Sequence, residues 1–219
     1  MPEYLELLRT SSIVSIYILL AEVVVLFLMW GKIKDRTLQI FAYVWVPFAA
    51  LTQFFMTYFR LNLHKSNLPL MNIYLIIEMI LLIYVLLKIR ETYKNKEINS
   101  LIWVAVILVG IALHLSDELN SLHSAAILYT AIVYFNLTIS FVDLEKENKI
   151  YRNPYALINL GVFVKAVGYS YFTIYNIDYK FPLGIYSALN LLVQAIFFIA
   201  IIFYYRQEKA NNSKETQTV

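Results

Sequence analysis

The sequence contains no cysteine in its 219 residues. This absence excludes disulfide bonds, thiolate metal sites and cysteine nucleophiles. It indicates no particular compartment, because a chain without disulfides fits any redox environment. Glycine and proline are also scarce, with five of each. Their scarcity disfavours transporters built from inverted repeats, whose helices are often interrupted by Gly or Pro in pairs.

Charge is scarce as well: 15% of the residues are charged and 60% are hydrophobic. A soluble domain has about 25% charged and about 45–50% apolar residues. The chain is therefore too apolar for that class. Its long apolar runs predict membrane spans, each of which needs about 20 residues to cross the hydrocarbon core.

Seven apolar runs follow one another, and they predict an all-α, polytopic integral membrane protein with a bundle of seven transmembrane helices. Residues 1–205 would form this single domain, and residues 206–219 a polar cytoplasmic tail expected to be disordered. No cleavable signal peptide is expected, and Pro47 should kink the second helix. The runs are Ile13–Trp30, Leu38–Phe59, Leu68–Leu87, Asn99–Leu115, Leu122–Val142, Pro154–Tyr175 and Leu183–Tyr205.

The positive charges are distributed unevenly between alternate loops. One side would carry only Arg9, Arg60, Lys65 and Lys180, whereas the other would carry the basic residues of 32–36, 88–96 and 146–152 and of the tail. The positive-inside rule then places the N-terminus outside and the C-terminus in the cytoplasm. The net charge of +3 is therefore a topology signal and does not indicate binding to nucleic acid.

Three ionisable residues lie deep in the predicted spans, near the middle of the first, third and sixth runs: Glu22, Glu78 and Lys165. An unpaired charge at that depth costs about 2.5–3.5 kcal/mol on insertion scales. We therefore expect all three to point inward, with Lys165 paired to one or both acids. One acid would stay protonated, because two carboxylates beside one ammonium do not ionise together easily.

Polar side chains near the same depth extend this cluster into a predicted ligand site or ion pathway. The additional members are Tyr74, Tyr169, Asn190 and Gln194. Tyr74 and Tyr169 are each one turn from a charged residue, Glu78 and Lys165 respectively. The competing interpretation is structural: buried amides often only bridge helices, and the ion pair could simply fix helix packing.

Motifs for metal binding and catalysis are weak or absent. His114, Asp117 and His123 are candidate metal ligands, but their spacing fits no zinc pattern and favours a solvated loop. The sequence has no HExxH, Walker, GxSxG or GxGxxG motif, so no cofactor is predicted and an enzyme is disfavoured. A retinal Schiff base is not expected, since microbial rhodopsins carry that lysine in the last helix.

Three segments resemble uncharacterised seven-helix bacterial inner-membrane proteins: NLPLMNIYLIIEMILL, NPYALINLGVFVKAVGYSYF and SALNLLVQAIFF. The resemblance covers the third, sixth and seventh predicted helices and implies a multi-pass protein of the bacterial inner membrane. In that group an aromatic residue stands at the position of Lys165, which would make the Glu–Lys pairing particular to this chain. The residues that carry the resemblance are Asn72, Tyr74, Glu78, Gly161, Gly168 and Asn190.

Three functional hypotheses follow. The first is a non-enzymatic membrane protein that senses, relays or assists, with the Glu/Lys cluster binding a small ligand or lipid or supporting the docking of a protein partner. The second is an ion- or proton-conducting pore, which one chain or a homo-oligomer could form and which would suit a bacterial defence effector. The third is an intramembrane enzyme with Glu78 as general base. The sequence favours them in this order.

Overall fold

The computed structural model describes residues 3–61, 68–94, 100–116, 124–139, 153–174 and 181–215. Within these ranges the chain is helical apart from short turns, and no strand occurs, so the all-α prediction is confirmed. The helices are α1 (Glu3–Leu28), α2 (Arg36–Ile40), the π-helix η1 (Phe41–Trp45), α3 (Val46–Leu61), α4 (Leu68–Lys94), α5 (Ser100–Leu115), α6 (Ser124–Ile139), α7 (Pro154–Ile174) and α8 (Phe181–Glu215).

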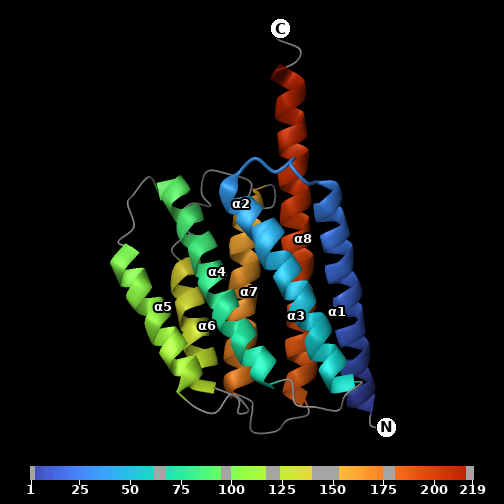
Figure 1. Ribbon diagram of the computed structural model, residues 1–219, viewed down its shortest axis with the longest axis vertical. Helices are drawn as coiled ribbons and strands as arrows, with labels where there is room; N and C mark the ends of the chain where they lie inside the picture. Colours follow the sequence, from blue (N-terminus) through green and yellow to red (C-terminus); the bar gives the residue numbers. More distant parts are fainter. Residues whose placement is uncertain are drawn as a thin grey trace.

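The helices lie side by side in one bundle, with the two ends of the chain at opposite ends of it (Figure 1). Since α2, η1 and α3 follow without a break, the described residues form seven successive helical segments, one for each predicted run. Three described helices are long and apolar enough to cross a membrane, over Arg36–Met56, Leu68–Glu91 and Leu189–Ala210.

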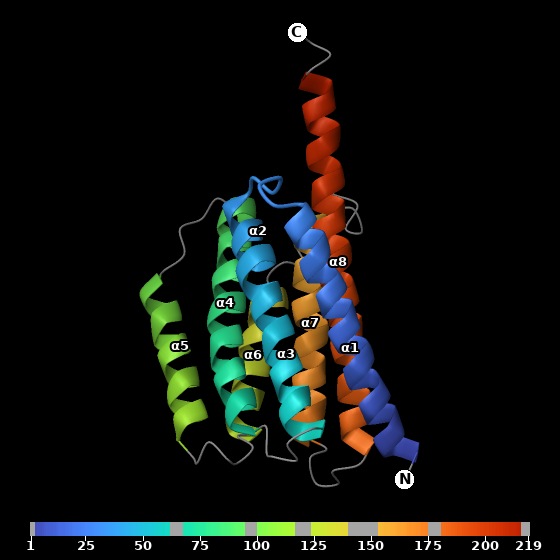
Figure 2. The same cartoon turned by 45° about the vertical axis from the view of Figure 1, so that its right-hand side comes forward.

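Apolar side chains are exposed along the outer faces of the helices at helical spacing. On α1 and α7 these stripes are Tyr17, Leu20, Val24 and Phe27, and Leu160, Phe163 and Val167. Helix α5 stands at the edge of the bundle (Figure 2) and exposes Leu101 by 77%. This agrees with its composition, because α5 carries no charged, hydroxyl or amide side chain between Ser100 and His114. Exposed apolar stripes of this kind suit contact with lipid.

The second helical segment changes its hydrogen-bond pattern just before Pro47. In η1 the backbone N–H of Val46 donates to the carbonyl of Phe41, five residues earlier. Proline has no N–H, and its ring clashes with the carbonyl four residues before it in a regular α-helix. The wider π-helical turn relieves this conflict and shifts the direction of the side chains in η1.

A stack of aromatic rings joins this π-helix to the rest of the core. Phe41 and Trp45 stack with centroids 5.2 Å apart, and both meet the ring of Phe197 from α8 edge-on, at 4.9 and 5.0 Å. Phe197 in turn lies against Gly161 of α7, where a Cβ atom would come within 2.3 Å of the ring. Glycine at position 161 therefore lets α7 and α8 pack closely.

Helix α8 is longer than the bundle is tall, and its C-terminal part projects beyond the other helices (Figures 1 and 2). Its 35 residues span about 52 Å at 1.5 Å per residue. The polar composition predicted disorder from Arg206, but α8 continues to Glu215. No Gly or Pro interrupts this stretch, and Arg, Gln, Glu, Lys and Ala are good helix formers. Residues 216–219 lie outside the described residues.

The contact between Gly161 and Phe197 gives a first test. We expect Gly161→Ala to lower the free energy of unfolding by about 1–3 kcal/mol, the usual cost of overpacking a core. The Phe197 ring cannot move aside easily because Phe41 and Trp45 hold it. Thermal unfolding of the purified protein in detergent would measure the loss.

Gly168→Ala is the matched control on the same helix. A Cβ atom at position 168 meets the side chain of Leu189 at 3.6 Å, which is an ordinary contact. We expect this variant to unfold within about 0.5 kcal/mol of the wild type. Equal losses in the two variants would contradict the packing argument.

Candidate functional site

The two charged residues predicted to pair do so in the middle of the bundle. Lys165 of α7 contacts Glu78 of α4 with Nζ 2.5 Å from Oε2. The Tyr169 hydroxyl donates a hydrogen bond to the other carboxylate oxygen, Oε1, at 2.6 Å. Glu78 is 0% and Lys165 5% exposed. Both oxygens of the buried carboxylate therefore have a partner, which a buried charge requires.

Three aromatic rings surround the ammonium group of Lys165. Its Nζ lies 5.5 Å from the ring centroid of Trp45, 5.8 Å from that of Tyr74 and 5.6 Å from that of Tyr169. Ring faces attract a cation at such distances, more strongly where water is excluded. The site is thus an ammonium held by one carboxylate and three rings, from η1, α4 and α7.

Helical spacing explains most of this arrangement. Tyr74 and Glu78 are four residues apart on α4, and Lys165 and Tyr169 are four apart on α7, so each pair lies on one helix face. Trp45 is the member that the sequence analysis missed. Nothing in its sequence neighbourhood marked it, because its position depends on the π-helical turn before Pro47.

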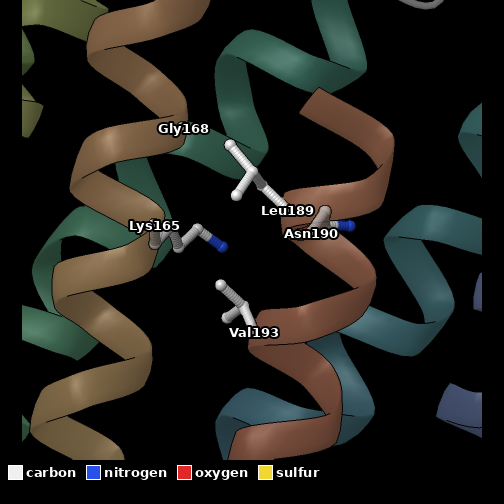
Figure 3. Close-up of a pocket in the computed structure, with 5 residues that line it drawn as sticks. All are labelled: Lys165, Gly168, Leu189, Asn190 and Val193. Atoms are coloured by element: carbon white, nitrogen blue, oxygen red, sulfur yellow. The ribbon is translucent and has the colours of Figure 1, made fainter. Parts of the chain in front are cut away.

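A small cavity borders the cluster on the side of α8. It is lined by Lys165, Gly168, Leu189, Asn190 and Val193. In Figure 3 the Lys165 side chain extends between α7 and α8 towards this space, whereas the amide nitrogen of Asn190 points away from it. The volume open to water-sized spheres is about 10 Å³, which is at the lower limit for holding one water molecule.

The remaining predicted members are buried but do not join the pair. Glu22 of α1 is 0% exposed, and neither of its carboxylate oxygens has a hydrogen-bond partner among the described residues. Gln194 of α8 is 2% exposed, and its side-chain oxygen likewise has no such partner. Of the two arrangements left open by the sequence, the structure has Lys165 paired with Glu78 alone.

The candidate metal ligands are only partly described. His114 is fully buried at the end of α5, rather than exposed in a solvated loop. Asp117 and His123 lie outside the described residues. Among the residues that are described, no group of three or more His, Cys, Asp or Glu side chains could hold a metal ion.

Comparison of the chain with models of known protein families, with curated proteins and with solved structures gives no match.

The Glu78–Lys165 pair joins two helices that otherwise have little contact. Helix α7 packs extensively on α6 and α8 but touches α4 only over a short stretch. The bonds from Lys165 and Tyr169 to Glu78 lie across that short contact. They are thus well placed to control how α7 sits against α4.

The ion pair gives a second test. We expect Glu78→Gln to destabilise the protein by about 3–5 kcal/mol, because it leaves the Lys165 ammonium buried without its counter-charge. The same substitution at the other buried acid, Glu22→Gln, should cost less than about 1 kcal/mol, since it breaks no bond to a described residue. Unfolding of both variants in detergent measures the difference.

A double variant tests whether Glu78→Gln destabilises the protein through the unpaired charge or through altered packing. Glu78→Gln combined with Lys165→Met removes both charges, so that no charge is left buried without its counter-charge. We expect it to regain most of the stability lost in Glu78→Gln. A double variant no more stable than the single one would show that charge balance is not the cause.

Proposed function

We propose that this chain is a non-enzymatic membrane protein that crosses the bilayer seven times and acts as a sensor or relay. The N-terminus would lie outside and the C-terminus in the cytoplasm. The input would be the state of the buried Glu78–Lys165 cluster, altered by a small ligand or lipid, and the output would be the position of the projecting end of α8. A bacterial inner membrane is the location implied by the sequence resemblance.

One observation supports the relay: α8 lines the cavity beside Lys165 and also forms the projecting end. Leu189, Asn190 and Val193 of α8 line the cavity beside Lys165. The same helix then continues without a break to Glu215, beyond the end of the bundle. From Val193 to Glu215 the rise is about 33 Å at 1.5 Å per residue. A shift of α8 at the cavity would therefore move its projecting end, which offers a surface to a protein partner.

The small size of the cavity fits a relay, because a small ligand or lipid could enter beside Lys165 only if α8 moves away from α7. An ion pathway needs a continuous polar or wet passage, and a general base needs space for a substrate within hydrogen-bond reach. Glu78 is fully buried and already accepts bonds from Lys165 and Tyr169. The space at the cavity beside Lys165 suits about one water.

Topology can be tested directly because the chain has no cysteine. A single cysteine at Lys65→Cys should react with a membrane-impermeant maleimide on intact cells. A single cysteine at Lys209→Cys should react only after the membrane is permeabilised. The reverse pattern would contradict the proposed orientation. Labelling of both sites on intact cells would contradict an odd number of spans between residues 65 and 209.

The relay predicts that the cluster controls the end of α8. We would place spin labels at Arg90→Cys on α4 and Lys209→Cys on α8 and measure the distance distribution between them. Glu78→Gln should shift or broaden this distribution, because α7 and the adjoining α8 lose their bond to α4.

The control is Thr52→Val, which removes a buried hydroxyl on α3 that donates to the Phe48 carbonyl within its own helix and should leave the distribution unchanged. A folded Glu78→Gln protein with the wild-type distribution would contradict the relay.

A further inference from the structure

The loop that joins α1 to α2 is fastened to the projecting helix α8. The backbone N–H of Asp35 donates to the Tyr204 hydroxyl at 3.1 Å. Lys34 Nζ lies 3.2 Å from a carboxylate oxygen of Glu208, and Lys32 Nζ lies 5.5 Å from the centroid of the Tyr205 ring. Three contacts to α8 thus hold a stretch of four residues, 32–35.

The same loop is also tied to the two helices that follow it, α2 and η1. The Tyr43 hydroxyl donates to the carbonyl of Met29 at 2.8 Å, and the Gln39 amide donates to the carbonyl of Ile33 at 2.7 Å. Gly31 makes the turn with a φ of 75°, which favours glycine. The loop is therefore ordered before any ligand arrives, which lowers the entropic cost of binding.

This fixed loop concentrates positive charge. Lys32, Lys34 and Arg36 are all exposed, at alternate positions in the sequence. Lys88 at the end of α4 adds a further basic group on this side of the bundle, although its ammonium already pairs with Glu91. Two cations held near each other at a surface are stabilised by an anion that both can contact.

Acidic residues nearby do not cancel the excess of positive charge on this loop. Among the described side chains at this end of the bundle, seven basic groups face three acidic ones. Each acid already has a partner: Asp35 accepts from the Leu38 N–H, Glu91 from Lys88, and Glu208 pairs with Lys34. The basic groups are Lys32, Lys34, Arg36, Lys88, Arg90, Arg206 and Lys209.

A membrane-interface residue stands beside the cations. Trp30 is 67% exposed and stacks at a tilt on Tyr43, with ring centroids 4.7 Å apart. Exposed tryptophan next to basic residues at the end of a membrane helix is typical of the headgroup layer. The basic loop would therefore meet lipid headgroups at the depth where their phosphates lie.

We propose that residues 30–36, together with the ends of α4 and α8, form a binding site for the phosphate headgroup of an anionic phospholipid. The proposal depends on the membrane location given under the proposed function. Lys32, Lys34 and Arg36 supply the charge. Trp30 packs on the acyl-chain side of the headgroup.

The test compares phosphatidylglycerol with phosphatidylcholine, both with oleoyl chains, added to purified protein in neutral detergent. Binding is followed by native mass spectrometry and by the unfolding temperature. The wild type should retain phosphatidylglycerol in preference to phosphatidylcholine and be stabilised by it. The triple variant Lys32→Gln, Lys34→Gln, Arg36→Gln should bind phosphatidylglycerol about 100-fold more weakly, at about 1 kcal/mol for each basic residue.

Two controls keep the result specific. Glu208→Gln breaks the bond to Lys34 without removing a cation and should keep the preference for phosphatidylglycerol. Arg60→Gln, Lys65→Gln, Lys180→Gln removes three basic residues that the sequence assigns to the opposite side and should also keep it. Equal binding of the two lipids by the wild type, or equal loss in both triple variants, would overturn the site. The cysteine-labelling experiment tests the membrane location separately, so a failure of the proposed function is distinguishable from a failure of this lipid site.

Discussion

The contact between Lys165 and Glu78 sets the conditions that the rest of the interior must meet. Removing two charges from water is costly, and the pair is tolerated only with good geometry and further hydrogen bonds. Tyr169 supplies the second bond to the carboxylate, and three rings face the ammonium. The pair contributes little net stability by itself, but the loss of one partner is expensive. It therefore specifies the position of α7 against α4.

The ring of Trp45, which borders the site, is held in place by contacts with residues outside the site. Gly161 admits the ring of Phe197, and Phe197 meets the edge of the stack that contains Trp45. Trp45 then faces the ammonium of Lys165. The π-helical turn before Pro47 lies at the start of this series of contacts. A helix irregularity that proline imposes is thereby used to direct an aromatic ring at a buried charge.

The sequence predicted the features that have a large energetic cost and missed those that depend on local geometry. The cost of intramembrane charge pointed to Lys165 and Glu78, and four-residue spacing pointed to Tyr169. Trp45 was not predictable, because its direction depends on the change from α to π hydrogen bonding. The isolation of Glu22 depends on which helices become neighbours, which periodicity does not reveal. The length of α8 was underestimated because polarity was given more weight than helix propensity.

Helix α8 connects the two sites that the structure suggests. It lines the cavity beside Lys165, and further along it holds the basic loop through Tyr204 and Glu208. If α8 takes two positions, each site must have a different affinity for its ligand in each position. Coupling of binding is reciprocal, so an anionic headgroup bound at the basic loop would bias the buried cluster, and a ligand at the cluster would alter headgroup affinity by the same factor. Under the proposed function, such a relay would respond to the lipid composition of its own membrane as well as to a ligand inside the bundle.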